Sequence, residues 1–173
     1  MEEKAIARQI PRKFSDVQKI AITGLLAGVY AAVTIALGSI SYGPINLRFA
    51  NLLIAVVPFV GWPGVFGISL GVFLGNISSP LGPIDLVSAL FSLLGLAIVK
   101  VLSRRTVLGG LASYSVILSL WVSFELMVAY GTPFFPIFYF VLAGITVVVV
   151  GFTYPLYRSL RSSGLLRRFS DAA

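Results

Sequence analysis

The uncharged stretch Ile20–Ile40, IAITGLLAGVYAAVTIALGSI, decides the fold of this chain. At about 1.5 Å per helical residue, it is long enough to cross the roughly 30 Å hydrocarbon core of a membrane. The 173-residue chain has a mean hydropathy of +0.99, and only 11% of its residues are charged. A soluble domain of this size carries far more charge. We therefore predict an integral membrane protein.

Five further apolar runs follow the first one, separated by loops that contain glycine and proline or basic residues. They cover approximately residues 47–60, 65–77, 84–102, 107–130 and 136–156. The sequence thus predicts an all-α, polytopic membrane fold with six transmembrane helices over residues 20–157. The runs at 47–60 and 65–77 are short, at roughly 21 Å of helix each. A re-entrant hairpin that enters from outside is the alternative for this pair.

Most of the basic residues lie in three patches, which indicate how the chain is oriented. An excess of Lys and Arg marks the cytoplasmic side of a membrane protein. With six spans, all three patches fall on that side, so we expect both termini in the cytoplasm. A basic N-terminal arm over residues 1–19 and a basic tail over residues 158–173 would flank the membrane domain. The patches comprise Lys4, Arg8, Arg12, Lys13 and Lys19; Lys100, Arg104 and Arg105; and Arg158, Arg161, Arg167 and Arg168.

Several kinds of chemistry are excluded by residues that the sequence lacks. It contains no Cys and no His, which excludes disulfides, thiol chemistry, histidine-ligated metal and histidine base catalysis. No G-x-x-x-x-G-K-[ST] phosphate loop occurs, so the chain cannot hydrolyse ATP by that route. We expect neither an enzyme nor a protein with a metal or cofactor. The basic residues flank apolar spans, which indicates contact with the lipid bilayer rather than with nucleic acid.

A few polar residues lie at a similar depth in the predicted outer leaflet. An ionised side chain near the centre of a bilayer costs on the order of 3 kcal/mol, so such groups tend to face each other or a wet cavity. Glu125 is too deep to cap a helix, whereas Asp85 could be a cap and Arg48 could snorkel or pair with either carboxylate. Two aromatic residues, Tyr42 and Trp121, could stack on a planar ligand. The predicted substrate-binding residues are Arg48, Asn51, Asn76, Asp85, Glu125, Trp121 and Tyr42.

Small residues recur every four positions along the first span. Gly24, Gly28, Ala32 and Ala36 form one stripe, and neighbouring alanines widen it. This spacing lets another helix approach closely. Packing within the chain's own bundle is one interpretation, and a docking face for a partner protein is the other. The predicted docking residues are Gly24, Ala27, Gly28, Ala31 and Ala32.

Three segments of the sequence form a further pattern: YGPINLRFAN at 42–51, VPF at 57–59 and GVFLGNISSPLGPID at 71–85. Over residues 42–94, this pattern resembles the QueT transporter family. One departure is Ala50-Asn51, which stands where the family usually has Ser-Glu, and Glu125 is the candidate to replace that glutamate. The residues that match the family pattern are Arg48, Asn76, Ser79, Pro80, Gly82 and Asp85.

The resemblance implies a substrate-binding (S) component of an energy-coupling factor transporter. Such components have six helices, bind a small solute near the outer face, and dock through the first helix to a transmembrane coupling protein driven by two ATPase subunits. The family is linked to uptake of queuosine precursors, which are deazaguanine bases. We therefore expect a multi-pass protein of the cell membrane that captures a small heterocyclic solute, either such a deazaguanine or a vitamin-like compound.

Two functions of other classes stay open at the level of the sequence. One is a small, self-sufficient homo-oligomeric transporter or channel whose ion path is lined by Asp85 and Glu125. The other is a non-transporting structural membrane protein in which the polar residues only lock the helices together.

Overall fold

The computed structural model describes residues 14–42 and 47–164, and within these ranges it contains helices and no strand. Most of the predicted N-terminal arm and the last part of the predicted tail lie outside the described residues. The helical content confirms the predicted all-α class. Four stretches are long and apolar enough to cross a membrane, and three shorter helical stretches lie between the first and second of them. The four are Asp16–Ala36, Gly82–Leu102, Val107–Tyr130 and Phe134–Ser163.

The first long helix, α2 (Asp16–Ala36), begins four residues before the predicted span. A capping box fixes this start, because Ser15 Oγ accepts from the Gln18 backbone N–H and Gln18 Oε1 accepts from the Ser15 N–H. The helix ends at Ala36, and the short helix α3 (Gly38–Ser41) follows. The predicted run is therefore divided near its end rather than continuous.

The second apolar run forms a 3-10 helix, η1 (Phe49–Val56), that continues into α4 (Val57–Val60). Gly61 follows with φ +68°, a conformation that glycine adopts without strain. Helix α5 (Trp62–Asn76) then starts at once, with Pro63 in its first turn, where a missing N–H costs nothing. The predicted runs at 47–60 and 65–77 leave a break over residues 61–64. This break is too long, because only Gly61 is non-helical.

Helix α5 packs closely along α2 through a row of glycines. A Cβ atom at Gly71 would lie 2.6 Å from Tyr30 Cβ and 3.0 Å from the Ala27 carbonyl oxygen. Similar close approaches occur where Gly67 meets Thr23 and where Gly75 meets Thr34. The residue numbers of the contacting pairs increase together along the two helices, so α2 and α5 run parallel. Their backbones approach closely because glycine has no side chain.

In the second half of the chain, α7 packs against both the helix before it and the helix after it. The 3-10 helix η2 (Gly82–Val87) leads into α6 (Ser88–Leu102), which packs against α7 (Val107–Tyr130). Helix α8 (Phe134–Thr146) returns along α7 and passes through a π-helical turn, η3 (Val147–Phe152), into α9 (Thr153–Ser163). Pro155 follows that turn, and Thr153 Oγ1 donates to the Val148 carbonyl at 3.0 Å.

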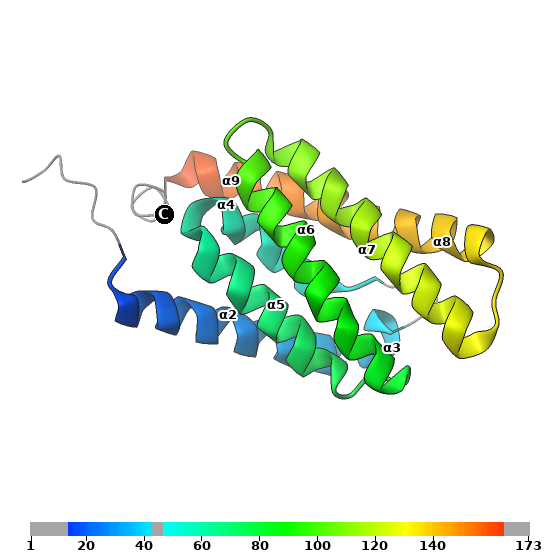
Figure 1. Ribbon diagram of the computed structural model, residues 1–173. Coiled ribbons are helices and arrows are strands. Elements are labelled where there is room, and N and C mark those ends of the chain that lie inside the picture. Colours follow the sequence, from blue (N-terminus) through cyan, green and yellow to red (C-terminus); the bar gives the residue numbers. More distant parts are fainter. Residues whose placement is uncertain (1–13, 43–46, 165–173) are drawn as a thin grey trace, which may run out of the picture.

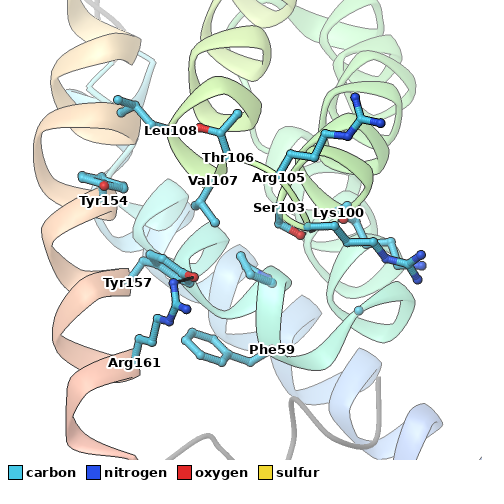
Figure 2. Close-up of a pocket in the computed structure, with 13 residues that line it drawn as sticks. Phe59, Lys100, Ser103, Arg105, Thr106, Val107, Leu108, Tyr154, Tyr157 and Arg161 are labelled. Carbon is cyan, nitrogen blue, oxygen red and sulfur yellow. Dashed lines mark hydrogen bonds between the residues drawn. The ribbon is translucent and has the colours of Figure 1, made fainter.

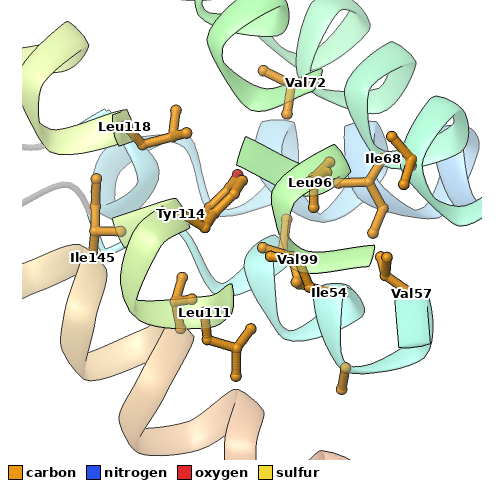
Figure 3. Packing of buried hydrophobic residues seen from close by; sticks show 14 of the residues in the cluster. Ile54, Val57, Ile68, Val72, Leu96, Val99, Leu111, Tyr114, Leu118 and Ile145 are labelled. Atoms are coloured by element: carbon orange, nitrogen blue, oxygen red, sulfur yellow. The ribbon is translucent and has the colours of Figure 1, made fainter. Parts of the chain in front are cut away.

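The connections gather at two opposite ends of the bundle (Figure 1). The turn at Gly61, the α6–α7 loop and the end of α9 lie at one end, which we call the basic end because Lys100, Arg104, Arg105 and Arg161 surround a shared cavity there. Helix α3, residues 77–81 and the loop at Gly131 lie at the other end. The apolar core lies between the two ends (Figure 3); its fully buried members include Ile54, Val57, Ile68, Leu96, Val99 and Leu111.

Candidate binding site

Three predicted polar residues meet at the end of the bundle opposite the basic end. Asn76 is the last residue of α5, Asp85 lies in η2, and Glu125 lies in α7. Gly82, with φ +75°, starts η2 in a conformation that favours glycine. Because residues three apart share a face of a 3-10 helix, Asp85 and Ser88 face the same way. Elements that are far apart in the sequence thus bring these side chains together.

Hydrogen bonds join this group, which we call the polar cluster: Asn76, Asp85, Ser88 and Glu125. Asn76 Nδ2 donates to Asp85 Oδ1 at 2.7 Å and to the Asp85 backbone carbonyl at 2.8 Å. Ser88 Oγ lies 2.9 Å from Asp85 Oδ1 and 3.0 Å from Glu125 Oε2. The cluster therefore ties α5, η2, α6 and α7 together.

Ser88 is the centre of the cluster. Its hydroxyl carries one hydrogen and can donate to only one of the two carboxylates at a time. It also accepts from the indole N–H of Trp121 at 2.9 Å. Ser88 can therefore satisfy only one of the two carboxylates at a time, and although Asp85 also accepts from Asn76, each carboxylate has hydrogen-bonding capacity to spare.

That spare capacity is visible as buried atoms without a partner. Asn76 Oδ1, Asp85 Oδ2 and Glu125 Oε1 are buried and accept no hydrogen bond from the described residues. Asp85 is 1% exposed and Glu125 0% exposed. A buried polar atom without a partner costs free energy, on the order of 1–3 kcal/mol. Three acceptors that all lack donors are suited to a ligand that carries several N–H groups.

Arg48 lies beside the cluster and forms no ion pair with it. Its side chain is 6% exposed, its Nε has no partner, and no carboxylate of the described residues lies within 4.0 Å of it. Asp85 and the hydroxyls of Tyr30 and Tyr114 are nevertheless near enough for electrostatic interaction. The pairing with Asp85 or Glu125, one of the alternatives for Arg48, is therefore not formed, and Nε of the guanidinium can still donate to a further group.

The remaining predicted residues surround this group in different ways. The Tyr42 ring lies 5.8 Å from the Arg48 guanidinium carbon, and its hydroxyl donates to the Gly75 carbonyl. Trp121 stacks on Phe91, with ring centroids 4.2 Å apart. Asn51 forms no hydrogen bond with the polar cluster among the described residues, and its Oδ1 accepts from the Tyr30 hydroxyl at 2.7 Å.

Sequence reasoning missed Tyr30, Tyr114 and the central role of Ser88. Tyr30 and Tyr114 are fully buried, and each makes a polar contact: Tyr30 with Asn51, and Tyr114 with Ser92 at 3.2 Å. The spacing of Ser88 three residues after Asp85 was the available signal. The two tyrosines gave none, because a tyrosine in an apolar span is usually a packing or interfacial residue.

A family model matches most of the sequence. This model, described as QueT transporter, covers residues 20–162. The chain belongs to the QueT transporter family. The chain is accordingly a multi-pass membrane protein of a transporter family, and the resemblance over residues 42–94 is confirmed. Comparisons with curated proteins and with solved structures found no match.

In this QueT family member, the small-residue stripe of α2 is divided between two environments. Ala27 and Ala31 are buried within the bundle, at 3% and 8% exposure. Gly24, Gly28 and Ala32 are exposed, and a Cβ atom at either glycine would meet nothing within 4 Å. The α2–α5 contact thus uses one face of α2 and leaves a second small-residue face open.

Proposed function

We propose that this QueT family member is a substrate-binding component that captures a small heterocyclic solute at the polar cluster. The observation that carries this proposal is the set of buried acceptors on Asn76, Asp85 and Glu125 that no described residue satisfies. In a purely structural cluster, such atoms are expected to be paired with one another or with neighbours.

The donor and acceptor pattern suits a deazaguanine base, as the family resemblance implies. The polar edge of such a base presents N–H and amino donors next to a carbonyl acceptor. The three free acceptors complement the donors, and the Arg48 guanidinium complements the carbonyl. Tyr42 and Trp121 supply aromatic surface close by. Asn51, whose Oδ1 accepts from the Tyr30 hydroxyl, completes the proposed set of substrate-binding residues. A vitamin-like heterocycle with the same edge would fit equally well.

The proposed topology has six transmembrane helices and cytoplasmic termini. Gly61, the turn between α4 and α5, lines the same cavity as Lys100, Arg104 and Arg161. If this segment were a re-entrant hairpin that entered from the outer side, the turn at Gly61 would lie within the membrane and would not reach the basic end. The positive-inside rule then assigns the basic end to the cytoplasm. On this proposal, residues 20–157 form the membrane domain, and 1–19 and 158–173 are cytoplasmic.

Purification of the chain from its native membrane, followed by mass spectrometry, tests this function. We expect about one retained heterocyclic molecule per chain, because the cluster offers a single set of acceptors. We also expect co-purification of a membrane coupling protein and ATPase subunits. Transport by the purified chain alone in liposomes, driven by an ion gradient, would contradict the proposal.

The exposed face formed by Gly24, Gly28 and Ala32 is the proposed docking surface for the coupling protein. Replacing Gly28 with leucine is expected to reduce the co-purified coupling protein by about tenfold, because a large side chain keeps the two backbones apart. Substrate binding should survive, since Gly28 contacts no residue of the polar cluster. An exposed substitution away from this face, Leu90→Ala on α6, is the control. Unchanged recovery of the partner with Gly28→Leu would exclude this surface.

A further inference from the structure

A second candidate site lies at the basic end, away from the polar cluster. A cavity of about 840 Å³ is enclosed there by the α4–α5 turn, the α6–α7 loop and α9. Figure 2 shows Tyr154, Tyr157 and Arg161 on α9 at one side of the opening and Lys100 and Arg105 at the other, with the Arg105 side chain directed away from α9. Three parts of the chain that are distant in sequence therefore build its walls.

The cavity concentrates positive charge that no carboxylate of the described residues neutralises. Its lining carries four cationic side chains and no carboxylate. Among residues 14–42 and 47–164, the one ion pair joins Lys19 to Asp16, so these four cations have no acidic partner there. Glu125 is also the single acidic residue between Asp85 and Asp171 in the sequence. Like charges that line one cavity favour the binding of an anion there. The four are Lys100, Arg104, Arg105 and Arg161.

Neighbouring aromatic residues contact two of these cationic side chains. Lys100 Nζ lies 4.6 Å from the Trp62 ring centroid, and Arg161 Nη1 donates to the Tyr157 hydroxyl at 3.4 Å. Thr106 caps the first turn of α7, so the positive end of that helix dipole also points toward the cavity lining. Arginine forks bind phosphate oxygens in a bidentate manner and are more weakly hydrated than lysine.

The surroundings of the cavity indicate a lipid rather than a soluble anion. Trp62 and Leu108 are 44% and 43% exposed, and Val101 is 59% exposed. Tryptophan at the end of an apolar span marks the depth of the lipid headgroups. Exposed apolar side chains beside the cavity offer a surface for acyl chains. Basic pockets between transmembrane helices are typical sites for anionic headgroups.

We propose that this cavity binds the phosphate headgroup of an anionic phospholipid. Arg104 and Arg105 on the α6–α7 loop and Arg161 on α9 hold the phosphate, and Lys100 adds further positive charge. The bound lipid links α9 to the α6–α7 loop. The proposal does not depend on the identity of the solute at the polar cluster.

Native mass spectrometry of the delipidated full-length chain tests the site by titration with phosphatidylglycerol and phosphatidylcholine of equal acyl chains. We expect phosphatidylglycerol to bind at least about tenfold more tightly. The double variant Arg104→Gln/Arg161→Gln should lower that affinity by roughly twenty-five-fold, at about fivefold for each charge removed. Arg158→Gln is the matched control, because Arg158 is an exposed α9 arginine outside the cavity lining, and its effect should stay below about threefold.

Several results would overturn the lipid assignment. Equal affinity for the two lipids would show that no specific headgroup site exists. The same conclusion would follow if Arg158→Gln lowered the affinity for phosphatidylglycerol by about fivefold, as expected for each cavity arginine. Inorganic phosphate that binds as tightly as the lipid, with the same dependence on Arg104 and Arg161, would identify a site for free phosphate. Tighter binding of an acidic peptide than of phosphatidylglycerol would identify a protein partner instead. Thermal unfolding of each variant separates loss of the site from loss of the fold.

Discussion

Replacement of Gly71 with leucine is expected to lower the stability of the helix bundle more than any other substitution proposed for this chain. A Cβ atom at this position would lie 2.6 Å from Tyr30 Cβ and 3.0 Å from the backbone of α2, a contact that no rotamer change relieves. Overpacking of a buried site costs 1–3 kcal/mol and sometimes more, and we expect about 3 kcal/mol here. Thermal unfolding of the purified protein, followed by the loss of its folded fraction, measures the effect.

Gly28→Leu is the matched control for this experiment. It introduces the same residue into α2, at a glycine where a Cβ atom meets nothing within 4 Å. Its unfolding temperature should stay close to that of the unmodified chain. Equal destabilisation by the two substitutions would show that the row of glycines on α5 does not form the close contact with α2.

Glu125→Gln is expected to lower the affinity for a deazaguanine base by roughly 10- to 100-fold. A hydrogen bond to an ionised group contributes about 1.5–3 kcal/mol, and the substitution replaces one carboxyl acceptor of the proposed site with an amide. Glutamine preserves the shape of the side chain and can still bond to Ser88 Oγ, which is 3.0 Å from Glu125 Oε2. Equilibrium binding of the labelled base to the purified chain gives the affinity.

Two further variants separate a binding role from a structural one. Asp85→Asn should weaken binding similarly while the protein still folds. Ser115→Ala is the control, since the Ser115 hydroxyl bonds only to the Leu111 carbonyl one turn earlier in its own helix. If Glu125→Gln and Asp85→Asn both unfold the protein and the unmodified chain binds no base, the polar cluster only locks the helices.

The extent of the helices follows well from the sequence, because apolar runs and their glycine and proline breaks are local signals. The predicted run at 107–130 coincides with α7, and the run that ends at residue 102 coincides with the end of α6. Helix starts were less predictable. The start of α2 at Asp16 depends on a capping box among polar residues, and hydropathy does not register it.

The gathering of Asn76, Asp85 and Glu125 was predictable from depth alone, because polar groups in lipid seek one another. Their role as a binding site remains a prediction. The glycine row at Gly67, Gly71 and Gly75 was not recognised, although its spacing matches that of the stripe on the first span. The cavity at the basic end could not be predicted, because it forms only where α9 folds back toward the α6–α7 loop.

The tight winding of η1 changes how far this stretch of chain reaches. A 3-10 helix rises about 2.0 Å per residue, whereas an α-helix rises about 1.5 Å. The segment Phe49–Val56 therefore advances about 16 Å, where the same residues in an α-helix would advance about 12 Å. A run that looks too brief for the bilayer thus covers more of its thickness, and its slimmer cross-section leaves room for the helices around it.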